Sequence, residues 1–417
     1  MGFQHIAVVG AGAVGGFFGA MLAKAGHRVT LIGRAAHVQA IQRDGLQLHK
    51  GGQVEAVRLG ASSDIAAVQG ADLVLFCVKS TDTAAAARQM APHLAPAAVV
   101  LSLQNGVDNP PVIARQVPAH AVVPTVVYVA TAMPEPGVVK HFGRGDLVIG
   151  PLNAAGADVA GQARLQAVAD LFAGAGVPVR ISPTVMVELW SKLMVNCAYN
   201  AISGLAQLPY GRMAALPEVQ AVMRTAVQEV VAVAQAEGVD LPLQASLEAM
   251  DAIARAMPAQ LSSTAQDMAR GKLSEIDHLN GYVARRGAEL GIPTPVNQTL
   301  HALVKLVEAG RAAAWTSRCS RCPASSCWRC VSWVLDCPIH RWAARSPAAC
   351  RPTSGGFARR KVRSAPSVRW LSCASRPTGV RRSSATSTRR AGCRWRQTPR
   401  PAVRRACSVS IRSAACS

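Results

Sequence analysis

The sequence predicts an α/β domain followed by an all-helical domain and then a disordered basic tail. In residues 1–181, short apolar runs alternate with glycine turns and amphipathic segments, the pattern of strands connected by helices. In residues 182–315, apolar residues recur at helical spacing and no strand candidate occurs. Residues 316–417 show no apolar periodicity. We therefore expect two folded domains that meet near residue 182.

The first thirty residues predict one strand–helix–strand unit. An apolar run at His5–Val9 is followed by a glycine turn, an amphipathic segment over 17–25 and a second apolar run at Arg28–Ile32. In this setting the pattern GxGxxG is the fingerprint of a dinucleotide-binding Rossmann domain, and a glycine turn without a ligand is the alternative. The residues expected around the pyrophosphate are Gly10, Ala11, Gly12, Ala13, Val14 and Gly15.

Each fingerprint glycine has a physical purpose. Gly10 permits the tight turn, Gly12 lets the backbone approach a pyrophosphate, and Gly15 lets the helix pack closely on the strand. The N-terminus of the following helix then offers free amides to the phosphates. After the second strand the chain reads Gly33-Arg34, where an NAD enzyme would carry an acid. A guanidinium there favours NADP(H), and a surface arginine is the alternative.

Two further apolar runs end in polar residues. Residues 72–78 lead into Lys79, and residues 97–103 lead into Gln104-Asn105-Gly106. In an open parallel sheet, ligands bind beyond the carboxyl ends of the strands. We expect Lys79 to approach cofactor phosphate or ribose, and Asn105 to approach the nicotinamide or the substrate. Turn formation by Asn-Gly is the alternative explanation.

Periodicity predicts the remaining elements. Strands are expected at 122–129, 138–142, 147–150 and 177–181, and helices at 163–173, 217–237, 243–256, 264–290 and 299–314.

The helix that opens the second domain carries a polar stripe. We expect it to begin at Pro183, with Ser182 as its cap. Lys192, Asn196 and Asn200 are spaced four residues apart, so they share one narrow face among apolar neighbours. The stripe is either a structural or solvated face or the wall of a pocket for a small oxygen-rich molecule. Its place just after a Rossmann domain favours the pocket.

Two later residues are not distinctive on chemistry alone. Ser263 lies in the loop that starts the 264–290 helix, where it is suited to capping. Glu275 and Asp277 cannot share a helical face, and a solvated Glu275 is the plain interpretation. The ten histidines are scattered, and we interpret them as structural or surface residues.

Charge and cysteine are concentrated in the tail. Residues 1–315 hold 23 basic and 22 acidic residues, whereas residues 316–417 hold 22 basic residues and one acid, Asp336. The body therefore gives no argument for a nucleic-acid or membrane partner. It contains two isolated cysteines, Cys77 and Cys197, which fits a reducing cytoplasm. We expect no signal peptide, because the first residues lack a cationic region, and no membrane span, because no apolar run is long enough.

The tail invites two functional interpretations that we do not favour. Four cysteines between 319 and 330 come in pairs, but the gap between pairs is too short for a zinc ribbon, so no metal is expected. A polybasic arm for nucleic acid is the second interpretation. The composition is what a GC-rich gene yields when it is read out of frame, so we expect an out-of-frame, disordered segment.

Together these motifs resemble the ketopantoate reductase (2-dehydropantoate 2-reductase) family of the 6-phosphogluconate-dehydrogenase-like superfamily. The resemblance covers residues 3 to about 312. It rests on GAGAVG at 10–15, Lys79, QNG at 104–106, ELWSKLMVNCAYN at 188–200, SSTAQD at 262–267 and SEIDHLNG at 274–281.

The resemblance implies the cytoplasmic, NADPH-dependent reduction of 2-dehydropantoate to pantoate, in pantothenate and coenzyme A biosynthesis, by a homodimer built on the helical domain. It implies Lys192 as the general acid and Glu275 beside the substrate and the nicotinamide. It assigns the cofactor to the residues of the glycine turn and to Arg34, Lys79, Asn105, Ala130 and Glu275. It assigns the substrate to Asn105, Lys192, Asn196, Asn200 and Ser263.

Ketone reduction agrees with the residues themselves, because a cation in a dry cleft both stabilises the developing oxyanion and supplies a proton. One departure affects the substrate: where the family often has an asparagine, this chain has Tyr210. A reductase of another 2-oxo acid, such as an opine-type or hydroxy-acid dehydrogenase, is therefore the first alternative. A non-catalytic NADP(H)-binding sensor and a nucleic-acid binder acting through the tail are the others.

Overall fold

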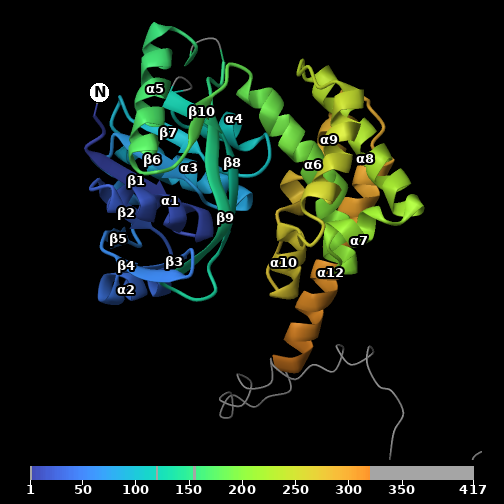
Figure 1. Ribbon diagram of the computed structural model, residues 1–417, viewed down its shortest axis with the longest axis horizontal. Coiled ribbons are helices and arrows are strands. Elements are labelled where there is room, and N and C mark those ends of the chain that lie inside the picture. Colours follow the sequence, from blue (N-terminus) through green and yellow to red (C-terminus); the bar gives the residue numbers. More distant parts are fainter. Residues whose placement is uncertain (1, 119–120, 154–155, 320–417) are drawn as a thin grey trace, which may run out of the picture. The chain divides into compact units, whose positions relative to one another are not determined.

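The computed structural model describes residues 2–118, 121–153 and 156–319, with side chains up to residue 310 (Figure 1). Its strands are β1 (His5–Val9), β2 (Arg28–Ile32), β3 (Leu46–Lys50), β4 (Gln53–Val57), β5 (Gly60–Ser62), β6 (Leu73–Phe76), β7 (Val99–Ser102), β8 (Val122–Ala132), β9 (Val138–Ile149) and β10 (Val179–Ile181). Its helices are α1 (Ala13–Lys24), α2 (Ala35–Asp44), α3 (Thr83–Met90), α4 (Asn109–Ala114), α5 (Val159–Gly174), α6 (Val185–Ala206), α7 (Tyr210–Ala214), α8 (Pro217–Ala236), α9 (Leu243–Ala256), α10 (Ser263–Ala269), α11 (Asn280–Leu290) and α12 (Pro295–Cys319). Short 3₁₀ turns include η2 (Ser80–Asp82) and η6 (Ile276–His278).

The strands form one sheet in the order β4-β3-β9-β8-β7-β6-β1-β2-β5. Its centre is parallel: β1 pairs with β2 and β6, and β7 pairs with β6 and β8. The long strands β8 and β9 are antiparallel, and β10 is attached to β9. The carboxyl ends of β1, β2, β6 and β7 therefore lie along one edge, and the polar residues predicted to bind ligand follow these ends.

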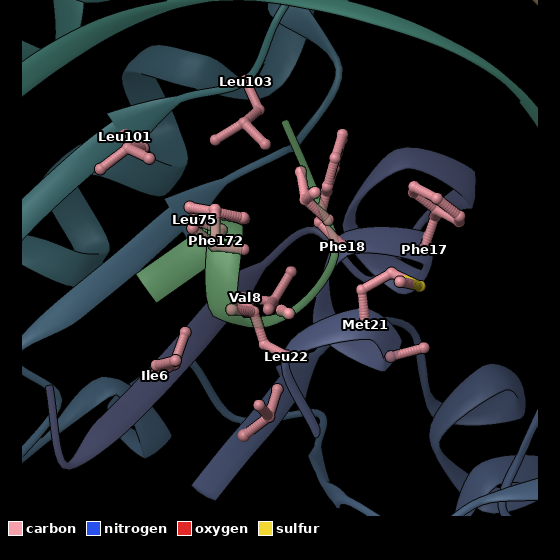
Figure 2. Packing of buried hydrophobic residues seen from close by; sticks show 14 of the residues in the cluster. Ile6, Val8, Phe17, Phe18, Met21, Leu22, Leu75, Leu101, Leu103 and Phe172 are labelled. Atoms are coloured by element: carbon pink, nitrogen blue, oxygen red, sulfur yellow. The ribbon is translucent and has the colours of Figure 1, made fainter. Parts of the chain in front are cut away.

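The parallel strands are buried on both faces. Ile6 and Val8 of β1 pack with Phe18 of α1 and Phe172 of α5, together with apolar residues of the neighbouring strands (Figure 2). The alternate residues of the same strand pack in a second cluster with α3 and α4. Burial on both faces explains why the parallel strands are continuous apolar runs, which made them recognisable in the sequence.

The α6 helix was placed correctly but begins later than expected. Its first residue is Val185, after Thr184, and no side chain caps it. Ser182 instead extends the pairing with β9, because its backbone N–H donates a hydrogen bond to the Ile149 carbonyl. Its hydroxyl accepts a hydrogen bond from the Thr184 amide at 3.3 Å. Ser182, three residues before α6, is thus held by β9, which fixes where the chain leaves the sheet.

The predicted helix over 264–290 was wrong. The structure has α10, then an irregular segment with the turn η6, and then α11. Gly271 adopts a left-handed φ of +67°, and the Lys272 amide returns to the Asp267 carbonyl, which closes the end of α10. Residues 274 and 275 then make long-range hydrogen bonds that a helical pattern does not reveal.

The strands predicted at 138–142 and 147–150 are one strand, β9. Its middle is irregular, because Arg144 has a left-handed φ of +57° and the pairing with β8 shifts register nearby. The glycines on either side of Arg144 resembled a turn in the sequence. In the fold they permit a bulge within a continuous strand.

Several short elements were not predicted at all, namely α2, β3, β4, β5, α3, α4 and α7. In the expected tail, the backbone of α12 stays helical as far as Cys319, and residues 320–417 lie outside the described part of the chain. Among the helices that the structure describes, none is long and apolar enough to cross a bilayer.

Candidate active site

In the glycine turn, a side chain would clash at Gly10 and Gly15 but would have free space at Gly12 between them. At Gly10, with φ +98°, an added Cβ would lie 2.5 Å from the Cys77 carbonyl carbon and the Val78 amide nitrogen. At Gly15 it would overlap the Gly10 carbonyl oxygen. At Gly12, by contrast, a Cβ would meet nothing within 4 Å. The open position is where the fingerprint places the pyrophosphate, so the turn fits a dinucleotide.

The helix after this turn offers free amides. Gly12 is the N-cap of α1, no side chain caps the helix, and its first turn contains no acid. The first amides of a helix have no intrahelical partners and carry partial positive charge. This end of α1 is therefore suited to an anionic phosphate.

Arg34 lies beside this turn. The amides of Gly10 and Ala11 both bond to the Ile32 carbonyl, two residues before Arg34. Arg34 is exposed, and within the described residues its guanidinium makes no hydrogen bond or ion pair. A guanidinium in this position is free to bind a phosphate group.

Asn105 and Glu275 are brought together from opposite ends of the chain. The Asn105 Nδ2 donates to Glu275 Oε2 at 3.2 Å. The other carboxylate oxygen of Glu275 accepts from the Ser80 amide and hydroxyl, both at 3.0 Å. Glu275 is thus half-buried and fully engaged, which contradicts the alternative of a solvated side chain.

Lys79 is also engaged by a distant segment. Its ammonium donates to Asp267 Oδ2 at 3.0 Å and to the Leu273 carbonyl at 2.8 Å. The side chain remains 44% exposed, so a cofactor phosphate could share it with these partners. Lys79, Asn105 and Glu275 therefore form one group at the carboxyl ends of β6 and β7.

Lys192 is oriented by the β8 strand. Its Nζ donates to the Val127 carbonyl at 2.6 Å and lies 5.8 Å from the centre of the Tyr128 ring. Burial lowers the pKa of Lys192 to about 8; the charge of Glu275 opposes this shift, and that of Arg144 adds to it. Lys192 is thus electrostatically coupled to the Asn105–Glu275 group, and its pKa is suited to proton transfer near neutral pH.

The rest of the α6 stripe faces the start of α10. Asn200 is buried, and its Nδ2 lies 3.5 Å from the Ser263 hydroxyl, a long contact. Asn196 makes no side-chain hydrogen bond within the described chain. The cap of α10 is Ser262, which accepts from the Ala265 amide, so Ser263 is not the cap and its hydroxyl stays available.

Two predicted residues lie outside these groups. Ala130 is an exposed residue of β8 at the second register shift of the β8–β9 pair. Tyr210 is buried in the helical core, where its ring lies 4.5 Å from that of Tyr199. Burial raises the pKa of Tyr210 to about 12. The tyrosine therefore packs as a core residue.

Sequence reasoning missed several residues of this region. Ser80, Asp267, Tyr128 and Arg144 were given no role, although Ser80 directly follows Lys79 at a strand end, which was an available signal. The other three act through contacts between distant segments, for which the sequence holds no local sign. Two histidines also lie close to this group. His278, in the turn η6 next to Glu275, pairs with Asp108, and His301 pairs with Asp277 of the same turn.

Comparison with known families gives two consecutive matches. Residues 6–154 match the family described as "Ketopantoate reductase PanE/ApbA", and residues 184–308 match "Ketopantoate reductase PanE/ApbA C terminal". The 2-dehydropantoate 2-reductase of Halobacterium salinarum is 35% identical over 307 residues, which are 73% of this chain and 99% of that protein. The enzyme of the same name from Vibrio cholerae is 33% identical over 73% of this chain and 98% of its own.

Solved structures agree. A PanE/ApbA family ketopantoate reductase from Ralstonia eutropha JMP134 is 54% identical, with a TM-score of 0.68 over 74% of this chain and 99% of that one. D-Mandelate dehydrogenase with NADH and anilino(oxo)acetate is 26% identical, with a TM-score of 0.69 over 74% of this chain and 99% of that one. These matches define an oxidoreductase that acts on a CH–OH group and imply a nicotinamide cofactor. The chain belongs to the ketopantoate reductase family.

Proposed function

We propose that this protein reduces 2-dehydropantoate to pantoate with NADPH. The observation that carries the proposal is Lys192, a half-buried lysine whose pKa is lowered to about 8 and is influenced by the charge of Glu275. Glu275 in turn accepts a hydrogen bond from Asn105, at the carboxyl edge of the sheet. The names of the relatives add support, since several of them are 2-dehydropantoate 2-reductases.

Lys192 acts as the general acid. Bound NADPH would supply a hydride to the C2 carbonyl carbon of 2-dehydropantoate, and the carbonyl oxygen would gain negative charge. With a pKa of about 8, Lys192 is mostly protonated at pH 7, so its ammonium can stabilise this oxygen and then donate a proton to it. The Val127 carbonyl holds the ammonium in place through one of its three N–H bonds.

Three polar side chains hold the rest of the substrate. Among the described residues Asn196 has no side-chain hydrogen-bond partner, and Asn200 and Ser263 share a long contact of 3.5 Å. These groups can therefore turn toward a carboxylate and a hydroxyl without losing strong bonds within the protein. We assign them to the carboxylate and the terminal hydroxyl of 2-dehydropantoate.

Asn105 and Glu275 occupy the position between substrate and nicotinamide. Asn105 is fixed by its backbone, because its carbonyl accepts from Asn109 Nδ2 at 2.7 Å. Its amide can then bind the nicotinamide side of the cofactor or the substrate carbonyl. The charge of Glu275 raises the pKa of Lys192 against the effect of burial, which keeps the acid charged at working pH.

Arg34 supports the choice of NADPH over NADH. It stands where an NAD enzyme would carry an acid, and no acidic side chain of the described chain occupies its guanidinium. Two of the structural neighbours contain NADH, so the preference needs a direct test. We expect Arg34→Ala to raise the KM for NADPH and to leave the KM for NADH nearly unchanged. Equal changes for both would contradict the assignment.

A second candidate is the reduction of a bulkier 2-oxo acid. Its support is the structural neighbour D-mandelate dehydrogenase, together with Tyr210, which stands where the family often has an asparagine and packs into the core. Loss of that amide would remove one partner for the substrate hydroxyl. We expect the residues of the general acid and cofactor sites to serve either substrate.

The deciding experiment measures NADPH oxidation with 2-dehydropantoate, phenylglyoxylate and a panel of other 2-oxo acids. We expect the highest kcat/KM for 2-dehydropantoate and a kcat/KM about 10³-fold lower for Lys192→Ala, which should still bind NADPH. A higher kcat/KM for phenylglyoxylate would favour the second candidate. Binding of NADPH without turnover of any 2-oxo acid by the wild-type protein would indicate a sensor. The homodimer implied by the resemblance stays a prediction for sedimentation analysis.

A further inference from the structure

Two pairs of side chains join the loop after β7 to the turn η6. The first is the bond between Asn105 and Glu275. The second is formed three residues later on both segments, where His278 Nδ1 lies 2.7 Å from Asp108 Oδ2. The two pairs form successive rungs between the same pair of segments, and the first rung belongs to the proposed reaction site.

The segments that carry these rungs are closely apposed. Gly106 has a φ of +91°, and an added Cβ there would lie 3.1 Å from the His278 carbonyl oxygen. The His278 amide bonds to the Glu275 carbonyl at 2.9 Å, so the imidazole and Glu275 belong to one tight turn. A backbone displacement that carries His278 away from Asp108 would therefore also displace Glu275.

The second rung is arranged for a charged imidazole. His278 and Asp108 are only 20% and 17% exposed. Asp108 Oδ1 is buried and has no hydrogen-bond partner in the described part of the chain. A carboxylate that is half-satisfied and poorly solvated gains most from a full positive charge on its one partner.

The surrounding charges act in the same direction. Burial alone would lower the pKa of His278, but the hydrogen bond and charge of Asp108, followed by the charge of Glu275, raise it above the ordinary 6.5. Arg285 of α11 opposes them. The other titratable or charged groups on elements around the turn are Lys79, Asp82, Asp277, Tyr282, Arg286, Glu289, His301, Lys305 and Glu308.

Most of those other groups are bound elsewhere. Lys79 is held by Asp267, and both His301 and Lys305 are held by Asp277. Arg286 pairs with Glu237 at the end of α8 and with Glu289 in α11, and Glu308 accepts from Ser274. The hydrogen bond from His278 is therefore directed to Asp108 alone among the described carboxylates.

We propose that His278 and Asp108 are positioning residues for the reaction: the imidazolium–carboxylate pair pins η6 to the loop after β7 and so holds Glu275 on Asn105. This inference rests on the proposed function of Glu275 and Asn105. It makes the geometry of the site depend on pH. Since the folded chain holds His278 protonated above its ordinary range, the pair is complete below about pH 6.5 and is lost as the pH rises through the folded pKa.

The first test uses the cofactor-free protein and does not depend on activity. Histidine-selective NMR titration should give a pKa above 6.5 for His278, and Asp108→Asn should lower it. The protection factors of the amides of residues 275–279, that is, their exchange rates relative to the intrinsic rate at the same pH, should fall in Asp108→Asn and, in wild type, at alkaline pH. A His278 that titrates at or below 6.5, or that is unmoved by Asp108→Asn, would overturn the inference.

The second test measures NADPH-dependent reduction across pH for His278→Gln and Asp108→Asn. We expect kcat/KM to fall about tenfold near pH 6.5, mainly through KM, with the double variant no worse than the single ones. The remaining alkaline limb should be that of Lys192. His301→Gln is the matched control, because it removes an imidazole–carboxylate pair from the other side of the turn and should leave the titration of His278 unchanged.

The two tests separate the possible failures. If wild type reduces no 2-oxo acid, the proposed function fails, and the NMR titration still decides whether the pair exists. If wild type is active and the two variants keep its pH profile and KM, the positioning inference fails and the proposed function stands.

Discussion

The glycine turn at 10–15 and the turn at 275–278 both contribute to the candidate site, but they are built in different ways. The glycine turn is local: its shape follows from residues within the same strand–turn–helix unit and the strand beside it. Glu275 is placed by partners 195 and 170 positions away, Ser80 and Asn105. A locally built site tolerates little change in sequence, whereas a site built by distant contacts depends on how well its segments are held together.

The largest effect is expected at Lys192, the residue of the α6 stripe whose pKa is raised by the charge of Glu275 in the distant turn. Lys192→Ala should lower kcat/KM about 10³-fold, because it removes the proton donor while the cofactor site remains intact. In wild type, activity should fall as the pH rises through about 8, since the amine must be protonated to act as an acid. Steady-state kinetics from pH 6 to 9 measure both effects. An unchanged rate in Lys192→Ala would exclude it as the acid.

Gly15→Ala should have the next largest effect, and it tests how local the glycine turn is. The added methyl group would overlap the Gly10 carbonyl and lie 2.8 Å from the Val8 side chain. We expect the free energy of unfolding to fall by about 3 kcal/mol, measured by urea denaturation. Gly12→Ala is the matched control, because its methyl group meets nothing. It should fold normally and weaken NADPH binding.

These two predictions concern residues that the sequence identified. The glycine turn, the strand ends and the α6 stripe were predictable because each depends on short-range rules: turn conformation, apolar runs and helical periodicity. The interruption of the 264–290 helix was not predictable, because Ser274 and Glu275 leave the helical pattern for partners in α12 and after β6. Nor was the bulge at Arg144, since glycines on both sides of it are equally typical of a turn.

Residue identity also proved a poor guide to orientation. Tyr210 is the departure from the family that bears on the substrate; its ring lies in the core against Tyr199, and its effect on the substrate stays a prediction. The sequence left Ser263 open as a cap or as a substrate-binding residue, and the neighbouring Ser262 takes the cap position. In both cases neighbouring positions have similar propensities, and the packing of α6 against its neighbours decides which side chain points where.

Glu275→Gln tests the distant turn directly and should have a moderate effect. The charge of the Glu275 carboxylate raises the pKa of Lys192. Without this charge, the pKa of Lys192 should fall from about 8 to a lower value. We expect the alkaline limb of the pH profile to move to lower pH and kcat/KM at pH 7 to fall about tenfold. Arg144→Gln is the opposing control, because Arg144 lowers the same pKa and its removal should move the limb upward.

Asp267→Asn should have the smallest effect, because the ion pair it breaks is partly exposed. Lys79 is 44% and Asp267 23% exposed, and pairs of this kind contribute at most about 1 kcal/mol to folding. The Leu273 carbonyl would still hold the ammonium, so we expect the free energy of unfolding to change by less than about 1 kcal/mol. The freed charge should tighten NADPH binding slightly at low salt and not at high salt. A loss of several kcal/mol would mean that the distant turn is held mainly by this pair, and that the rungs at Glu275 and His278 are secondary.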